Sequence, residues 1–214
     1  MIIAVDGPAA SGKGTIARAL AKHYGLPYLD TGLLYRAVAA SVMRLGLDPA
    51  IEADAVAASN FDDMLLADPA LRDDETGKTA SIVSAHPLVR ATLLQRQRRF
   101  ARQEGGAVLD GRDIGTVIAP DADAKLFVKA TPTIRAKRRH TELQASGSTV
   151  SLDRVLADIR MRDLRDTTRS EAPLVAASDA ATLDTSFLSI EAALKRAIEL
   201  VERQMKLKAE REAG

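Results

Sequence analysis

The residues at positions 7 to 15, GPAASGKGT, have types and spacing that suit phosphate binding. They follow an apolar run, IIAV, and precede apolar residues that recur at helical spacing. Glycines at positions 7, 12 and 14 permit backbone conformations that a side chain would forbid, so successive N–H groups can point into one concavity at the positive end of a helix. Lys13 adds a mobile positive charge for the outer phosphates. The stretch predicts a phosphate loop, with a glycine-rich turn that binds nothing as the alternative.

The loop departs from the usual pattern at the residue after the lysine. Phosphate loops commonly have Ser or Thr there to hold Mg²⁺, whereas this chain has Gly14, followed by Thr15. Mg²⁺ dehydrates reluctantly, so we expect it to bind with the nucleotide mostly through water. We predict no metal site built from protein side chains, since the chain has no cysteine and its three histidines show no ligand spacing.

Arginines gather in the stretch RMRDLRDTTR, in the last third of the chain. Arg162, Arg165 and Arg169 share roughly one helix face, and like charges at this spacing repel unless an anion binds. The stretch RAKRR on the preceding predicted helix adds further positive charge. The cluster suits a second phosphate group, although Arg162 and Asp166, four residues apart, could equally form an ordinary helical ion pair.

The elements that must position these residues alternate along the chain, with short apolar strands between helices. Five strands are expected, at 1–6, 27–32, 106–111, 124–130 and 180–185. The alternation predicts an α/β fold with a parallel sheet covered by helices on both faces. Ligands of such sheets bind beyond the carboxyl ends of the strands, where the phosphate loop would lie. The region from 48 to 104 is expected to be mostly helical, with a loop at DPALRDDETG.

The composition argues against several classes of protein. The chain has 214 residues, 46% of them apolar, which is enough for one sizeable domain. A net charge of only +1 argues against a nucleic-acid partner, and 3% aromatic residues argue against stacking on single-stranded bases. No apolar run approaches the ~20 residues of a membrane span, and Asp6 interrupts the first apolar run, so we expect no membrane partner and no signal peptide. A cytoplasmic protein is expected.

Four further motifs carry a family resemblance. They are LDTGLLYRA at 29–37, ASIVSAHPLVR at 80–90, DGRDIGTV at 110–117 and RMRDLRDTTRSEAPL at 160–174. Taken with the GKGT of the loop, in this order and at these intervals, they resemble the bacterial cytidylate kinases, of the nucleoside monophosphate kinase group, over nearly the whole chain. The resemblance implies the P-loop nucleoside monophosphate kinase fold, a five-stranded parallel sheet flanked by helices, and γ-phosphoryl transfer from ATP to CMP or dCMP.

The resemblance also implies site residues. Positions matching Ser81, Arg90 and Asp113 read the cytosine, and those matching Arg162 and Asp166 contact the sugar hydroxyls. A carboxylate can accept from the N4 amino group of cytosine, whereas uracil has a carbonyl there, which is a physical basis for preferring cytosine. The implied CMP-binding residues are Thr31, Arg36, Ser81, Arg90, Arg112, Asp113, Arg162, Asp166 and Arg169. The implied ATP-binding residues are Gly7, Pro8, Ala9, Ala10, Ser11, Gly12, Lys13, Gly14 and Thr15, and the implied catalytic residues are Lys13, Arg112, Arg162 and Arg169.

The family's organisation implies one kinase domain over 1–214, with a short, mainly helical acceptor-binding insert at about 38–104 and a lid at about 131–169. The lid has few large apolar residues, so we expect its arginines, among them Arg138 and Arg139, to repel one another in the free protein and the lid to be mobile. A monomer is expected. Two alternatives stay open: a P-loop kinase for another acceptor, such as UMP or a small hydroxy acid, and a nucleotide-dependent switch without transfer.

Overall fold

The computed structural model describes residues 1–212 and divides into two compact units. The first unit contains Met1–Leu29 and the chain from Phe100 onward. The second contains Asp30–Arg99 and overlaps most of the segment that the family resemblance assigns to the acceptor-binding insert.

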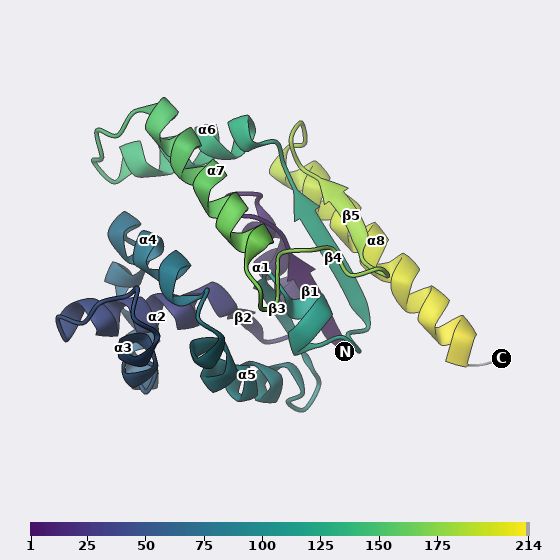
Figure 1. The fold of residues 1–214 in the computed structure, drawn as a ribbon. Coiled ribbons are helices and arrows are strands. Elements are labelled where there is room, and N and C mark those ends of the chain that lie inside the picture. The colour runs from purple at the N-terminus through teal and green to yellow at the C-terminus, as the bar shows by residue number, and fades with distance from the viewer. Residues whose placement is uncertain (213–214) are drawn as a thin grey trace. The chain divides into compact units, whose positions relative to one another are not determined.

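A five-stranded sheet forms the core of the first unit (Figure 1). Its strand order is β2-β3-β1-β4-β5. The strands are β1 (Ile2–Asp6), β2 (Tyr28–Asp30), β3 (Ala107–Gly111), β4 (Ala124–Lys129) and β5 (Ala181–Asp184). β1 pairs in parallel with β3 and β4, and β4 pairs in parallel with β5. The strands lie where the sequence predicts them, and the α/β class with a parallel sheet is confirmed.

Two helices pack against this sheet, α1 (Lys13–Tyr24) and α8 (Ile190–Glu212). Their apolar residues recur at helical spacing, so each helix presents one apolar stripe. Ile16 of α1 and Val201 of α8 join Leu126 of β4 in a single buried cluster. The cluster holds the start of α1 against the sheet and thereby holds the loop that joins β1 to α1.

A helical hairpin, α6 (Pro132–Ala145) and α7 (Leu152–Thr168), also belongs to the first unit. The hydroxyl groups of Thr131 and Ser151 cap the two helices by accepting backbone N–H groups in their first turns. The apolar cluster between the helices consists of Ala136, Leu143, Val155 and Ile159. The hairpin therefore has a small apolar core of its own.

The second unit is helical. Its elements are α2 (Thr31–Arg44), α3 (Glu52–Ala57), η1 (Asp63–Ala67), η2 (Pro69–Arg72), α4 (Asp74–Val83) and α5 (Pro87–Ala101). Residues 38–104, all of them described, contain no strand. The expected loop at DPALRDDETG is wrong, because η2 and the start of α4 occupy it. The Asp68 carboxylate caps η2 by accepting the N–H of Ala70 at 2.8 Å, and a proline follows it at the first helical position.

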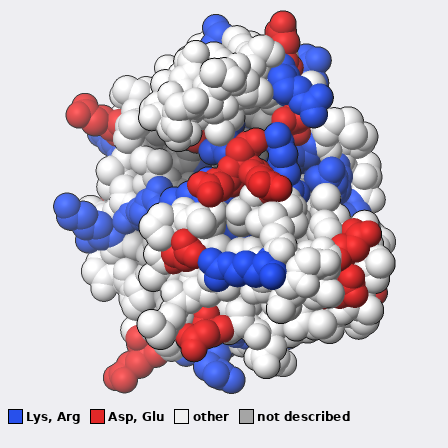
Figure 2. Space-filling model, turned by 90° about the vertical axis from the view of Figure 1, so that its left-hand side faces the viewer, with Lys and Arg blue, Asp and Glu red and all other residues white. Residues whose placement is uncertain are grey.

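Charges of both signs are interspersed on the surface. Figure 2 shows acidic and basic side chains next to one another on the face that it presents, as expected for a chain with a net charge of +1. Among residues 1–212, no helix combines the length and the apolar character that a membrane crossing requires.

Candidate active site

The phosphate loop runs from the end of β1 to the start of α1. Gly7 lies so close to β4 that a Cβ there would be 2.0 Å from the carbonyl oxygen of Val128, so only glycine fits. Gly12 has a φ of 88°, and its carbonyl oxygen accepts the N–H of Ile16 to begin the helix. Lys13 is the first residue of α1 and is half-buried. Among the described residues, the first turn of α1 carries no acidic side chain, so its positive end favours an anionic ligand.

Gly14, which replaces the usual Ser or Thr, lies against β3. A Cβ at this position would be 2.9 Å from Oδ2 of Asp110, so a larger residue would displace that carboxylate. Asp110 is 2% exposed, and Thr15, the next residue of the helix, is exposed. A buried carboxylate therefore lies beside the loop at the position where most phosphate loops carry a hydroxyl. Within residues 1–212, no group of three or more His, Asp or Glu side chains is placed to hold a metal ion.

Asp6, the last residue of β1, is a structural support of this site that the sequence reasoning missed. Its side chain is 5% exposed, and its two carboxylate oxygens accept the N–H groups of Ile114 and Gly115, both at 2.8 Å. Burial raises the pKa of Asp6 to about 6, although the two hydrogen bonds act to lower it. The bonds anchor the chain directly after Arg112 and Asp113. The sequence signal for it was an acidic residue at the end of an apolar strand.

Several predicted acceptor residues meet around one buried carboxylate in the first unit. Asp166 of α7 is 3% exposed, accepts a hydrogen bond from Nε of Arg112 at 2.8 Å and lies 4.0 Å from Nε of Arg162. Burial acts to raise the pKa of Asp166, but the positive charges of Arg112 and Arg162 outweigh it and lower the pKa. Arg169, directly after α7, donates from Nε to the carbonyl oxygen of Ala172 at 2.8 Å. The ionised carboxylate therefore holds two guanidinium groups in place.

Asp113, the residue predicted to bind the cytosine amino group, directly follows Arg112 in the chain. It is 4% exposed and precedes η3 (Ile114–Ile118), a short helical turn. Its carbonyl oxygen accepts the N–H of Val117 at 2.9 Å and that of Ile118 at 3.2 Å. The backbone at Asp113 is therefore held both by this turn and by the contacts of Asp6 with the next two residues.

The expected repulsion between lid arginines is wrong, because oxygen atoms of the first unit surround them. Arg139 pairs with Glu142, one turn further along α6, at 3.4 Å. Arg138 donates to the carbonyl oxygen of Thr185 at 2.7 Å. Carboxylates and carbonyl groups thus offset the positive charge of the hairpin without a nucleotide.

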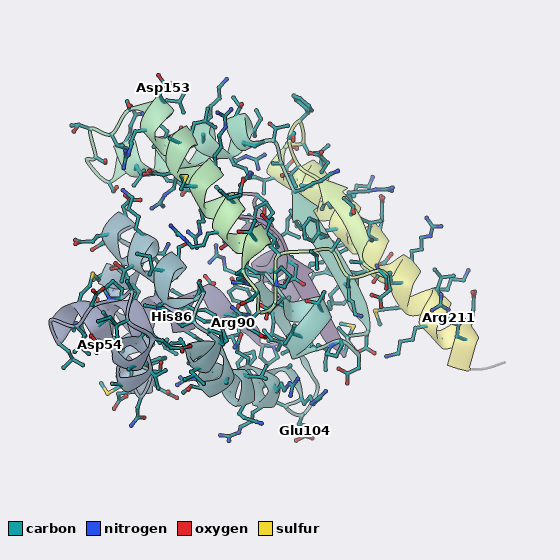
Figure 3. All side chains as sticks on the ribbon, in the orientation of Figure 1. Asp54, His86, Arg90, Glu104, Asp153 and Arg211 are labelled. Atoms are coloured by element: carbon teal, nitrogen blue, oxygen red, sulfur yellow. The ribbon has the colours of Figure 1, made fainter. Side chains whose placement is uncertain are left out.

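The second unit carries the other four predicted acceptor residues on α2, α4 and α5. Thr31 and Ser81 are both 3% exposed. Arg36 donates to two backbone carbonyl groups at the C-terminal end of η2, those of Leu71 and Asp73, at 2.6 and 3.1 Å. Arg90 of α5, labelled in Figure 3, has its guanidinium carbon 5.5 Å from the centroid of the Tyr35 ring. Protein oxygens and an aromatic face therefore orient both arginines within this unit.

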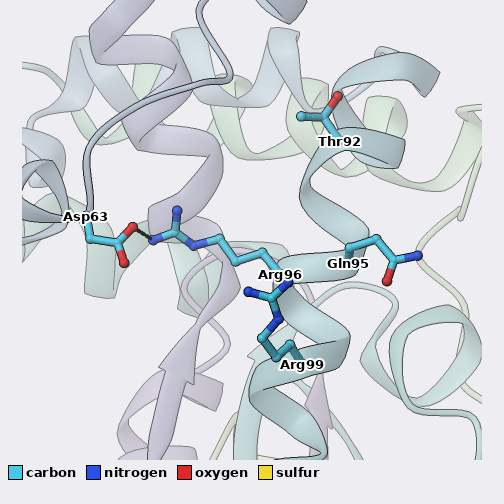
Figure 4. Close-up of a pocket in the computed structure, with 5 residues that line it drawn as sticks. All are labelled: Asp63, Thr92, Gln95, Arg96 and Arg99. Carbon is cyan, nitrogen blue, oxygen red and sulfur yellow. Dashed lines mark hydrogen bonds and ion pairs between the residues drawn. The ribbon is translucent and has the colours of Figure 1, made fainter.

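One cavity of the second unit is lined by residues other than the predicted site residues. It has a volume of about 360 Å³ and is lined by Asp63, Thr92, Gln95, Arg96 and Arg99 (Figure 4). Arg96 forms an ion pair with Asp63, and its guanidinium also lies 5.1 Å from the ring centroid of Phe61. None of the residues predicted to bind nucleotide lines this cavity, so it adds nothing to the candidate site.

Similarity to known proteins extends along nearly the whole chain. A family model described as cytidylate kinase matches residues 3–203. A cytidylate kinase of Xanthobacter autotrophicus is 58% identical, covering 94% of this chain and 97% of the relative, and one of Nitrobacter winogradskyi is 56% identical, covering 94% and 96%. Among solved structures, a gluconokinase from Sinorhizobium meliloti 1021 matches with a TM-score of 0.56 at 16% identity, covering 98% of this chain and 96% of that one. At that identity the likeness concerns the fold alone.

Proposed function

Because the chain belongs to the cytidylate kinase family, we propose that its phosphate loop holds ATP and that the residues after β3 and on α7 hold the acceptor nucleotide. The protein is an ATP-dependent nucleoside monophosphate kinase. It transfers the γ-phosphoryl group of ATP to CMP or dCMP and releases ADP with CDP or dCDP.

The observation that carries the assignment of residues is the pairing of β1 with β3. Asp6 at the end of β1 lies in register with Gly111 at the end of β3, and the N–H of Gly7 donates to the carbonyl oxygen of Gly111 at 3.3 Å. The phosphate loop continues from one strand end, and Arg112 and Asp113 continue from the other. This arrangement supports a donor phosphate and an acceptor nucleotide bound beside one another at the same edge of the sheet.

The reaction needs no general base, because the acceptor is already an ionised phosphate oxygen. The oxygen of CMP attacks the γ-phosphorus, and the bond to the bridging oxygen of ADP breaks as the new bond forms. Charge spreads over the transferred group, so catalysis rests on alignment and on fixed positive charge. We assign that charge to Lys13, Arg112, Arg162 and Arg169. Asp166 supports two of these arginines by holding their guanidinium groups.

Recognition of cytosine is assigned to Asp113, together with Ser81 and Arg90. The carboxylate of Asp113 would accept from the N4 amino group, and Arg90 would donate to the ring acceptors. Thr31 and Arg36 complete the acceptor set, with Arg36 contacting the phosphate.

Mg²⁺ bound with ATP would neutralise charge on the β- and γ-phosphates. The residues beside the loop fit such an ion, since Asp110 offers a carboxylate next to Gly14 and Thr15 offers an exposed hydroxyl at the start of α1. Both suit an ion that keeps several of its waters, so we propose contact mostly through water.

The segment 131–169 is proposed as the lid and the segment 38–104 as the acceptor-binding insert. A lid that closes over both nucleotides would exclude water and so prevent wasteful hydrolysis of ATP. A monomeric state and a cytoplasmic location are predictions from the sequence.

A coupled assay of ADP release tests the assignment. Purified protein is given MgATP with CMP, dCMP, UMP or AMP at equal concentrations, and kcat/KM is compared. We expect turnover with CMP and dCMP, and a kcat/KM for UMP lower by on the order of tenfold or more, since one good base contact discriminates by about 1–3 kcal/mol. Equal turnover of UMP or AMP would contradict the cytosine assignment, and ADP release that ignores the acceptor would favour a nucleotide-dependent switch.

A further inference from the structure

Three side chains from outside the phosphate loop reach its carbonyl oxygens. Nη1 of Arg135 donates to the carbonyl oxygen of Ala9 at 3.1 Å. The hydroxyl of Thr185 donates to the carbonyl oxygen of Ser11 at 2.8 Å, and Nη1 of Arg138 reaches the same oxygen at 3.3 Å. Arg135, Arg138 and Thr185 are called the loop clamp below.

Arg135 is committed to protein oxygens. It is 3% exposed, its Nε donates to the carbonyl oxygen of Ala130 at 2.9 Å, and its two terminal nitrogens pair with the carboxylate of Asp163 on α7. The sequence treats the arginines of this hairpin alike, as candidates to neutralise phosphate charge. The burial and the contacts of Arg135 set it apart, because its guanidinium faces protein groups on every bonded side.

The clamp acts on the orientation of two peptide groups. In a trans peptide the N–H of one residue points opposite to the C=O of the residue before it. Holding the carbonyl oxygens of Ala9 and Ser11 against the clamp therefore turns the N–H groups of Ala10 and Gly12 away from it. Ala10 also has a φ of 57°, a conformation that is costly for a residue with a Cβ and persists only where its surroundings enforce it.

We propose that the loop clamp positions the phosphate loop, holding its N–H groups ready for the phosphates of ATP before the nucleotide arrives. Arg135 also links the loop to α7 through Asp163. The position of α7, which carries Arg162 and Asp166, therefore influences the conformation of the loop. If the loop already has its binding conformation, ATP binding does not have to supply the free energy of ordering it. The inference rests on the proposed function, since it takes the phosphates of ATP as the ligand of the loop.

The test compares two replacements of one side chain. Thr185→Val removes the hydroxyl at nearly constant shape, and Thr185→Ser keeps it. The readout is the Kd for a non-hydrolysable ATP analogue with no acceptor present, measured by titration calorimetry. We expect Thr185→Val to weaken binding by on the order of tenfold, as for a lost buried hydrogen bond, and Thr185→Ser to stay within about twofold of the wild type. The Kd for CMP alone should not change in either.

Arg135→Lys is a second variant, because one ammonium group cannot reproduce the contacts that Nε, Nη1 and Nη2 of Arg135 make with Ala130, Ala9 and Asp163. It should weaken binding of the analogue at least as much as Thr185→Val. Arg154→Lys, in an exposed ion pair with Asp158 on α7, is the matched control and should bind normally. A folded Thr185→Val with unaltered affinity for the analogue, or one that loses affinity for the analogue and for CMP equally, overturns the proposal. If Arg135→Lys does not fold, the Thr185 pair decides. If the wild-type protein binds the analogue but does not phosphorylate CMP, the proposed function is wrong. The clamp is still tested in that case, because its readout is binding of the analogue.

Discussion

Replacing Asp6 by Asn should change how the stability of the protein depends on pH. The wild-type carboxylate is buried, and burial raises its pKa to about 6 from an ordinary value of 3.8. Between these two values the folded protein binds a proton that the unfolded chain has released, so the wild type gains stability as the pH falls through this window. Asparagine does not titrate, and the variant lacks this gain.

The size of the effect follows from the shift. A difference of roughly 2 pKa units means that ionised Asp6 costs about 3 kcal/mol of unfolding free energy at pH values well above 6. About 1 kcal/mol of that cost disappears between pH 7 and pH 5, because most folded molecules then carry the proton while the unfolded chain is still largely ionised. The unfolding free energy of the wild type minus that of Asp6→Asn should therefore rise by about 1 kcal/mol from pH 7 to pH 5.

Urea unfolding followed by circular dichroism, repeated at half-unit steps of pH, measures this difference. Contributions of other titrating groups cancel between the two proteins to the extent that they are independent of Asp6. The charged neighbours that influence it most are Asp113 and Arg112. Glu104→Gln, which removes an exposed carboxylate, controls for the loss of one negative charge. A difference that stays flat, or that falls as the pH falls, would refute the argument that burial dominates at Asp6.

The remaining predictions concern the loop, the base and the lid. Lys13→Ala should fold normally and lose phosphoryl transfer by several orders of magnitude, and near-normal turnover of the folded variant would rule out the phosphate-loop assignment. Gly7→Ala would place a Cβ 2.0 Å from the carbonyl oxygen of Val128 and should destabilise the protein by roughly 2 kcal/mol or more; an unchanged melting temperature would count against that packing. Asp113→Ala should lower kcat/KM for CMP by the equivalent of about 1–3 kcal/mol and leave the KM for ATP unchanged. An equal loss for ATP would mean that Asp113 serves the donor site or the stability of the fold instead. Amide hydrogen exchange in the lid beyond the loop clamp, at residues 140–160, should slow more than that of the strands when both nucleotides bind, and full protection there in the free protein would contradict a mobile lid.

Much of the fold could be predicted from the sequence because its signals are local. The five strands are short apolar runs separated by helical periodicity, and each lies within a residue or two of its predicted bounds. The phosphate loop could be located because glycine spacing, a preceding strand and a following helix all fall within a few residues of one another. The missed helical turn at Pro69–Arg72 also has a local signal, an aspartate directly before a proline, which is a capping residue followed by a favourable first helical residue.

The strand order and the partners of the charged residues were decided by the tertiary structure alone. The spacing of Arg162 and Asp166 on one helix offered an ion pair between them as an alternative to ligand binding, yet the closer partner of Asp166 is Arg112, 54 residues away in the chain. Likewise, Arg135 was one basic residue among several until the fold set it against the carbonyl oxygen of Ala9, across 126 residues. Glycine spacing and apolar periodicity act over a few residues and can be read along the chain. A hydrogen bond forms only when donor and acceptor lie within about 3.5 Å, and which distant oxygen comes that close to a guanidinium depends on which strands are neighbours in the sheet.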